Sequence, residues 1–408
     1  MTGYRQVLGV PGMAPLLAVS LLARTAITAA GMALTLYVVL GLHLGYAAAG
    51  AVPASLTAGL ALGGPLLGRL IDRRGLRTAL LATVVTQAGF WLALPALRYP
   101  VLLGAAFVAG LLMVPAQAVT RQAIAALSTG GQRRPAFALE SVQGELSYLV
   151  GPAAVILAAA TLSPATMAWG IGGAIVVGGA ALAALDPPLR SPDEAPAGTA
   201  PRPPRREWLG AGMIAVLVLA FGIALLLGGI DLAIVATLRQ AGQVSWASLV
   251  VAVCGLASVT GGLCYGMLNR PLPTWLLLGL LGVATVLAGL APSWPWLCLA
   301  VVGTGLLTAP TLSTVADAVS RLAPAGVRGE ATGLQASAMS AGVALGAPVV
   351  GWTIDASAPA AGFAAAGLAG LLAALAGHLL SRRARRPRHR DIHPEIAAPR
   401  PEPCQAKL

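Results

Sequence analysis

Residues 68–80 read GRLIDRRGLRTAL, a dense charged turn between two long apolar runs. Four arginines surround one acid, Asp72, while Gly68 and Gly75 give the backbone the freedom to reverse its direction. A turn of this charge between two apolar runs indicates a short cytoplasmic loop that joins two membrane helices. This prediction sets the fold class for the whole chain.

The composition agrees with a membrane protein. The chain has 408 residues, of which 57% are hydrophobic and 10% charged, and its mean hydropathy is +0.81. A soluble protein carries about 25% charged residues, so that class is excluded. We expect an all-α membrane protein with twelve helices, each long enough to cross a hydrocarbon core of about 30 Å. The expected spans are roughly residues 13–40, 47–67, 79–97, 101–127, 136–162, 165–185, 209–238, 247–268, 275–290, 296–322, 331–354 and 360–380.

The net charge of +12 follows membrane topology and does not indicate a nucleic-acid partner. Only Arg98 and Arg239 fall in loops opposite the charged turn, an asymmetry that places both termini in the cytoplasm. There is no basic face with interleaved aromatic residues, so no nucleic acid is expected to bind, and the basic tail is expected to touch anionic lipids. The four cysteines have no ligand or disulfide spacing. Without a metal-ligand cluster, phosphate loop or activated nucleophile, the sequence predicts no enzyme and no cofactor.

The order of the spans predicts two related halves. We expect a six-helix bundle over residues 1–185, a proline-rich cytoplasmic linker over 186–207, a second six-helix bundle over 208–381 and a basic, disordered tail over 382–408. Residues 110–127 align without gaps with 305–322, at an offset of 195 that also carries Gly151 to Gly346. When the offset is reduced by one residue, Gly68 aligns with Gly262 and Asp72 with Gly266, so the second half keeps the turn but loses the acid.

These features together resemble the major facilitator superfamily, in its twelve-helix bacterial type. The charged turn is similar to the family's loop between the second and third helices, and Gly68, Leu70, Asp72, Arg73, Gly75, Arg77 and Leu80 stand on its pattern, whereas Ile71 and Leu76 depart from it. The resemblance implies two bundles that rock about a midplane cavity, with the charged turn as a latch. Asp72 would then lie near a helix terminus of the opposite bundle, and Arg77 would pair locally. The alternative is a topological anchor, which requires arginines but neither an aspartate nor two glycines.

Ionisable groups inside the spans are the candidate coupling residues, because each is costly in the bilayer unless it is paired or faces a cavity. Counted from the cytoplasmic ends of their spans, Arg24 and Glu145 lie at similar depths, which predicts an ion pair in which Glu145 carries a coupling proton. Arg121 and Glu140 match nearer the cytoplasmic face and are interpreted as a structural pair. Asp231 either binds a cationic substrate or pairs with Arg239.

The polar residues of the spans complete the candidate sites. A mostly apolar cavity is expected, which suits amphipathic compounds better than sugars, with Gln87, Gln117, Gln143, Ser147, Tyr148, Asp231, Thr311 and Gln335 among its lining. Gly151-Pro152 and Gly346-x-Pro348 have two interpretations, close helix packing with a proline kink or part of a family exporter signature.

The leading functional hypothesis is proton-coupled export of a small amphipathic compound, such as a drug or natural product, by a monomer in the bacterial inner membrane. The alternatives are an importer of a small metabolite, by symport or uniport, and a scaffold or receptor that keeps the fold without transport.

Overall fold

The computed structural model describes residues 2–190, 203–268 and 272–385, and these residues form helices joined by short connections. The linker and tail predictions lie partly outside this range, as do residues 269–271 of the turn in the second half. The first half contains α1 (Thr2–Leu8), α2 (Met13–Leu36), α3 (Tyr46–Arg74), α4 (Leu76–Ala93), α5 (Tyr99–Leu111), α6 (Ala116–Leu127), α7 (Arg133–Thr161) and α8 (Pro164–Leu185).

The second half has the same order of long helices. It contains α9 (Arg205–Trp208), α10 (Ala211–Gln240), α11 (Ala247–Met267), α12 (Thr274–Ala288), α13 (Trp294–Leu322), α14 (Arg328–Ala356) and α15 (Pro359–Arg385). Within the described part of the chain, 11 helical segments are long and apolar enough to cross a membrane, and α12 is a shorter apolar helix of 15 residues. The all-α membrane architecture predicted from the sequence is therefore present.

Two of the expected spans are not uniform α-helices. The first continues α2 through a π-helical turn, η1 (Tyr37–Gly41). The fourth is broken between α5 and α6, where Leu112 to Pro115 leave the helix. The side chain of Gln87, fully buried in α4, donates hydrogen bonds to the freed carbonyls of Ala109 and Leu112, at 2.7 and 3.2 Å. A break in a membrane helix is tolerated when the protein satisfies the exposed backbone in this way.

Close helix packing repeats between the halves. A Cβ atom on Gly110 of α5 would lie 1.9 Å from the carbonyl oxygen of Leu56 in α3. On its repeat mate, Gly305 of α13, a Cβ would lie 2.4 Å from the carbonyl oxygen of Cys254 in α11. Both positions therefore require glycine, because the backbones approach to contact distance. The corresponding helix pairs, α3 with α5 and α11 with α13, therefore pack in the same way in the two halves.

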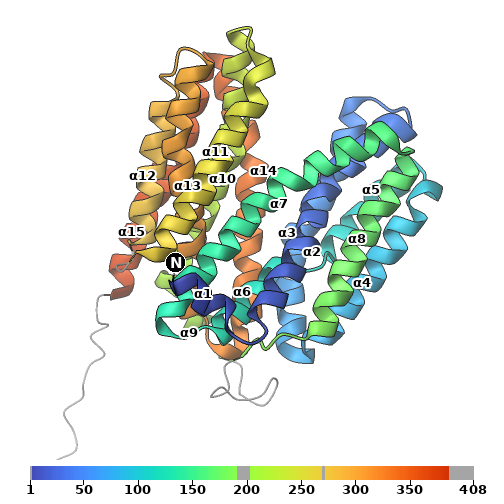
Figure 1. Cartoon of the computed structure of the whole chain (residues 1–408), viewed down its shortest axis with the longest axis vertical. Coiled ribbons are helices and arrows are strands. Elements are labelled where there is room, and N and C mark those ends of the chain that lie inside the picture. The colour runs from blue at the N-terminus through green and yellow to red at the C-terminus, as the bar shows by residue number, and fades with distance from the viewer. Residues whose placement is uncertain (1, 191–202, 269–271, 386–408) are drawn as a thin grey trace, which may run out of the picture.

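The two halves meet at one end and diverge toward the other (Figure 1). The ends of α3, α7, α11 and α14 that meet lie beside α1, α6 and α9, which we call the linker end. Every hydrogen bond and ion pair between the halves that is described below lies toward this end. The conformation is therefore closed at the linker end.

Candidate functional site

The charged turn reaches across to the other half. The carboxylate of Asp72, at the end of α3, accepts hydrogen bonds from the backbone N–H groups of Gly329 and Glu330, at 3.1 and 3.0 Å. These two residues form the first turn of α14, where unpaired N–H groups and the helix dipole favour a negative charge. Asp72 is only 8% exposed, so water screens this contact weakly. The geometry is the one that the family resemblance implied.

The other residues of the turn let Asp72 make this contact. A Cβ on Gly68 would lie 2.1 Å from the carbonyl oxygen of Gly329, so α3 and α14 touch through their backbones. Gly75 has φ +85°, a left-handed conformation that favours glycine, and it separates α3 from α4. Arg77 pairs with Asp186 at 2.9 Å within its own half, whereas Arg73 is exposed. The latch function of these residues remains a prediction.

Further ion pairs lie at the linker end, and two of them join the halves. Glu330 accepts hydrogen bonds from Arg69 of α3 at 2.8 Å and from Arg205 of α9 at 2.6 Å. Arg133, at the start of α7, lies 2.9 Å from Asp317 of α13, which also pairs with Arg321. The pair of Asp317 with Arg321 joins residues four apart on one helix. The pairs of Arg69 with Glu330 and of Arg133 with Asp317 depend on how the halves dock.

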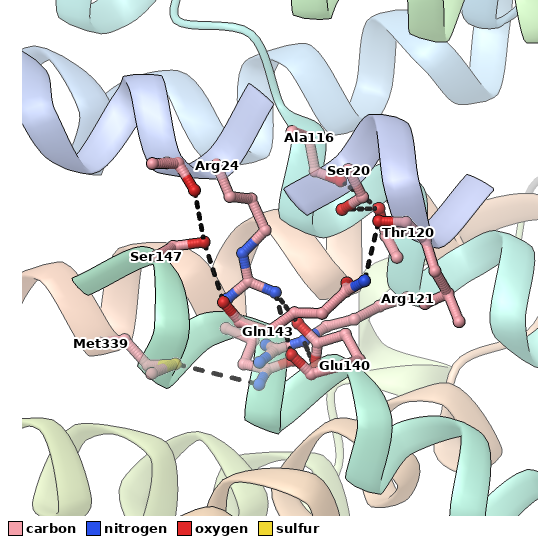
Figure 2. Close-up of polar contacts among 12 residues, drawn as sticks. Ser20, Arg24, Ala116, Thr120, Arg121, Glu140, Gln143, Ser147 and Met339 are labelled. Carbon is pink, nitrogen blue, oxygen red and sulfur yellow. Dashed lines mark hydrogen bonds and ion pairs between the residues drawn. The ribbon is translucent and has the colours of Figure 1, made fainter. Parts of the chain in front are cut away.

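A buried charged cluster lies inside the first half (Figure 2). Glu140 of α7 is fully buried and pairs with Arg24 of α2 at 2.5 Å and with Arg121 of α6 at 3.2 Å. With its amide oxygen turned toward the two arginines, Gln117 accepts hydrogen bonds from both, at 3.2 and 2.9 Å. The expected pair of Arg121 and Glu140 is therefore formed, and it shares its carboxylate with a second arginine.

The predicted ion pair of Arg24 with Glu145 is wrong in this conformation. Helix α7 begins at Arg133, three residues before the predicted start, so Glu140 lies about 10 Å and Glu145 about 18 Å along it. Arg24 lies about 16 Å along α2, and a helical side chain points back toward the start of its helix. The guanidinium of Arg24 therefore lies at the level of Glu140. Gly144 leaves the space it needs, because a Cβ there would lie 2.7 Å from Nη2 of Arg24.

Glu145 and Asp231 remain without an ion pair among the residues that the structure describes, and Asp231 does not pair with Arg239 there. They lie on opposite halves, in α7 and α10, yet close enough for their charges to interact. Tyr148, one turn beyond Glu145, is 68% exposed and interacts electrostatically with both acids. These three residues form an accessible surface between the halves.

Most of the other predicted cavity residues are enclosed by protein. Gln87 supports the broken fourth span, Ser147 bonds to the backbone of its own helix and Thr311 to that of α13. Gln335 is 1% exposed, and Gln143 donates to the carbonyl of Leu17 in α2 at 2.7 Å. In this conformation these side chains stabilise helix packing and offer little surface to a substrate.

The glycine and proline pairs of α7 and α14 also lie at helix contacts. A Cβ on Gly151 would lie 2.5 Å from the hydroxyl of Thr28 in α2, and one on Gly346 would lie 2.4 Å from the carbonyl oxygen of Leu225 in α10. Pro152 and Pro348 lie inside their helices, which continue through them. The packing interpretation therefore accounts for both motifs in this conformation.

The fold and the charged contacts define a polytopic helical membrane transporter. The chain belongs to the Major Facilitator Superfamily, whose family model matches residues 16–275 and 212–402. It is a transporter and not an enzyme. A comparison with curated protein sequences finds no significant match.

Solved structures of distant sequence share the fold. A bacterial homologue of the iron transporter ferroportin, in an outward-facing state, is 17% identical with a TM-score of 0.73, over 91% of this chain and 99% of that one. The human organic anion transporter MFSD10 (TETRAN) is 17% identical with a TM-score of 0.68, over 92% and 99%. The proton:xylose symporter XylE is 14% identical with a TM-score of 0.68, over 92% and 96%. At these identities the likeness shows the fold alone.

Proposed function

We propose that this protein is a secondary transporter that exports a small amphipathic compound in exchange for protons, by alternating access. The observation that carries this proposal is the state of the ionisable groups inside the spans. Arg24 and Arg121 both pair with Glu140 in a closed cluster, whereas Glu145 has no ion pair among the described residues. An acid that is partly buried in a membrane helix without a fixed partner can gain and lose a proton as its surroundings change.

The geometry supports the role of Glu145 and changes the role of Arg24. Because Glu140 holds the Arg24 guanidinium at 2.5 Å, Arg24 acts on Glu145 only at longer range. Arg24 then stabilises the negative form of Glu145 without trapping it in an ion pair. If both termini are cytoplasmic, as the arginine distribution favours, the closed linker end makes this an outward-facing conformation, in which Glu145 would take up a proton from outside.

An amphipathic substrate fits the accessible surface better than a sugar. Sugars need many hydrogen-bonding partners, and most polar side chains of the spans are used in packing between helices. An import function is the alternative, because the fold is shared with a proton:xylose symporter. The direction is tested by substrate accumulation in cells that express the protein, which falls for an exporter and rises for an importer.

The test of proton coupling uses Glu145→Gln in proteoliposomes with an imposed proton gradient. The variant is expected to lose gradient-driven transport while the amount of protein in the membrane stays unchanged. Asp355→Asn is the matched control, since it also removes one carboxylate from a long helix, near the end of α14 away from the linker, and is expected to transport normally. Gradient-driven transport at the normal rate by Glu145→Gln would overturn the proposal.

A further inference from the structure

Two acids on opposite halves, Glu145 and Asp231, lie close enough for their charges to interact, and they indicate a ligand of opposite charge. Glu145 belongs to the first half and Asp231 to the second, and their negative charges repel each other. Among residues 2–190, 203–268 and 272–385, neither acid has a basic partner within ion-pair distance. Arg24 is the basic residue that acts on Glu145, and it is bound to Glu140. A cation between the two acids would compensate both.

A second, independent feature of the same place is a hydroxyl that lacks a partner. Ser258 of α11 is 1% exposed, and its oxygen lies beside Glu145 without completing a hydrogen bond in the described structure. An unsatisfied buried hydroxyl costs free energy, about 1–3 kcal/mol in proteins. The thiol of Cys254, one turn earlier on α11, also lies within reach of the charges of both acids. The second half therefore contributes Ser258 as well as Asp231 to this surface.

The surroundings favour an organic cation over a metal ion. A hard metal ion such as Ca²⁺ needs six to eight oxygen ligands, and the described residues contain no group of three or more His, Cys, Asp or Glu side chains that could hold a metal. An organic cation needs only one or two acceptors and an apolar or aromatic surface. Tyr148 supplies the aromatic ring, 68% exposed and one turn from Glu145, where it can form a cation–π contact.

We propose that Glu145, Asp231 and Tyr148 form a binding site for a small organic cation, shared between the two halves. This inference rests on the proposed transport function and names its substrate class. Because one acid comes from each half, a bound cation would hold the halves in a definite relation, and release would let them separate. A proton on Glu145 would compete with the cation for the same carboxylate, which gives exchange of one for the other.

The experiment is binding to the purified, detergent-solubilised full chain. Tetraphenylphosphonium is the probe, and tetraphenylborate, which has the same shape and the opposite charge, is its control. We expect tetraphenylphosphonium to bind the unaltered protein and raise its melting temperature, and tetraphenylborate to do neither. Glu145→Gln and Asp231→Asn are each expected to weaken binding by at least about tenfold, whereas Asp355→Asn leaves it unchanged. Tyr148→Phe should retain binding and Tyr148→Ala should weaken it.

Protons should also compete with the probe. The charged and titratable groups around Glu145 are Asp231 of α10, Arg24 of α2, Tyr148 of α7 and Cys254 of α11. Acidification should weaken binding of tetraphenylphosphonium, because protonation of either acid removes a negative charge that the probe needs.

The outcomes separate this inference from the proposed function. Equal binding of the two probes, no binding of tetraphenylphosphonium, or unchanged binding in both acid variants would each overturn the cation site. Proton-driven transport of a neutral compound could still be present in those cases. Transport by the unaltered protein that does not depend on a proton gradient, with probe binding intact, would overturn proton coupling and leave the cation site supported.

Discussion

Replacement of Asp72 by asparagine tests whether the charged turn controls the exchange between conformations. In the structure the Asp72 carboxylate accepts two backbone N–H groups at the start of α14 and is 8% exposed. A hydrogen bond to a charged group contributes about 1.5–3 kcal/mol, and a charge at a partly buried helix terminus up to about 2 kcal/mol. The asparagine keeps one acceptor oxygen but loses the charge. We therefore expect the closed linker end to lose about 1–3 kcal/mol, a shift of about 5- to 150-fold in the conformational equilibrium.

The assay is labelling of a cysteine that is hidden when the linker end is closed. Val142 of α7 is a suitable position, because it is 8% exposed and its Cγ2 would lie 3.2 Å from a Cβ placed on Gly262 of α11, in the other half. Valine and cysteine have similar size, so Val142→Cys should disturb the contact little. The native cysteines are first replaced by serine, since Cys264 is exposed. Asp72→Asn is expected to accelerate labelling by the factor given above.

The matched control is Arg74→Gln, which changes one charge in the same turn at an exposed side chain. It should leave labelling unchanged if the contact of Asp72 with α14 is what matters. An equal labelling rate in Asp72→Asn and the unaltered protein would refute the latch and return the turn to the role of topological anchor. Equal acceleration by both variants would point to the charge of the loop instead of this contact.

Two further predictions concern backbone contacts. Gly68→Ala should open the linker end in the same labelling assay, because its Cβ would lie 2.1 Å from the carbonyl oxygen of Gly329, whereas Gly89→Ala, with nothing within 4 Å, should have no effect. Gln87→Leu should lower the free energy of unfolding by about 1–3 kcal/mol, measured by denaturation in detergent, because it leaves the carbonyls at the broken fourth span unsatisfied; unchanged stability would mean that water or lipid replaces the amide.

The sequence predicted the parts of the structure that depend on local patterns. The charged turn is one example, because its glycines, acid and arginines lie within 13 residues, and the family resemblance supplied the partner of Asp72. The break in the fourth span was not predicted. Pro115 alone could not indicate it, since its repeat mate, Pro310, lies within the continuous helix α13. The carbonyls at the break are satisfied by Gln87 in a neighbouring helix, which a single-span pattern does not contain.

The charged pairs show the same limit. Arg121 with Glu140 was predicted correctly because both lie near a short connection, whereas the partner of Arg24 depended on where α7 begins and on the direction of a long side chain. The contact of Arg205 with Glu330 was missed because it joins the linker to a helix 125 residues away. Such contacts are set by the packing of segments that are far apart in the sequence.

The place of the missing acid in the second half is taken by the N-terminal helix. Gly266 occupies the position that corresponds to Asp72, and a Cβ on it would lie 2.1 Å from the hydroxyl of Tyr4 in α1. That hydroxyl donates a hydrogen bond of 2.5 Å to the carbonyl of Leu263 in α11. Since α1 also packs against α7, Tyr4 bridges the two halves at the linker end. In the first half, the Asp72 carboxylate at the end of α3 thus accepts hydrogen bonds from helix N–H groups. At the corresponding position of the second half, the Tyr4 phenol donates a hydrogen bond to a helix carbonyl.

This arrangement predicts that Tyr4→Phe also accelerates labelling of Val142→Cys. One neutral hydrogen bond contributes about 0.5–1.5 kcal/mol, so the expected factor is about 2 to 12, smaller than for Asp72→Asn. Burial raises the pKa of Tyr4 to about 12, from an ordinary value of 10.0. The neutral donor is therefore fully present below pH 10 and is lost only as the pH rises through 12, so the effect of the variant should not change between pH 6 and 9. Arg5→Gln, an exposed change on the same helix, is the control. The two contacts lie on different helix pairs, so the double variant of Asp72→Asn and Tyr4→Phe should accelerate labelling by the product of the two single factors. If the double variant is labelled no faster than Asp72→Asn, α1 does not hold the halves together.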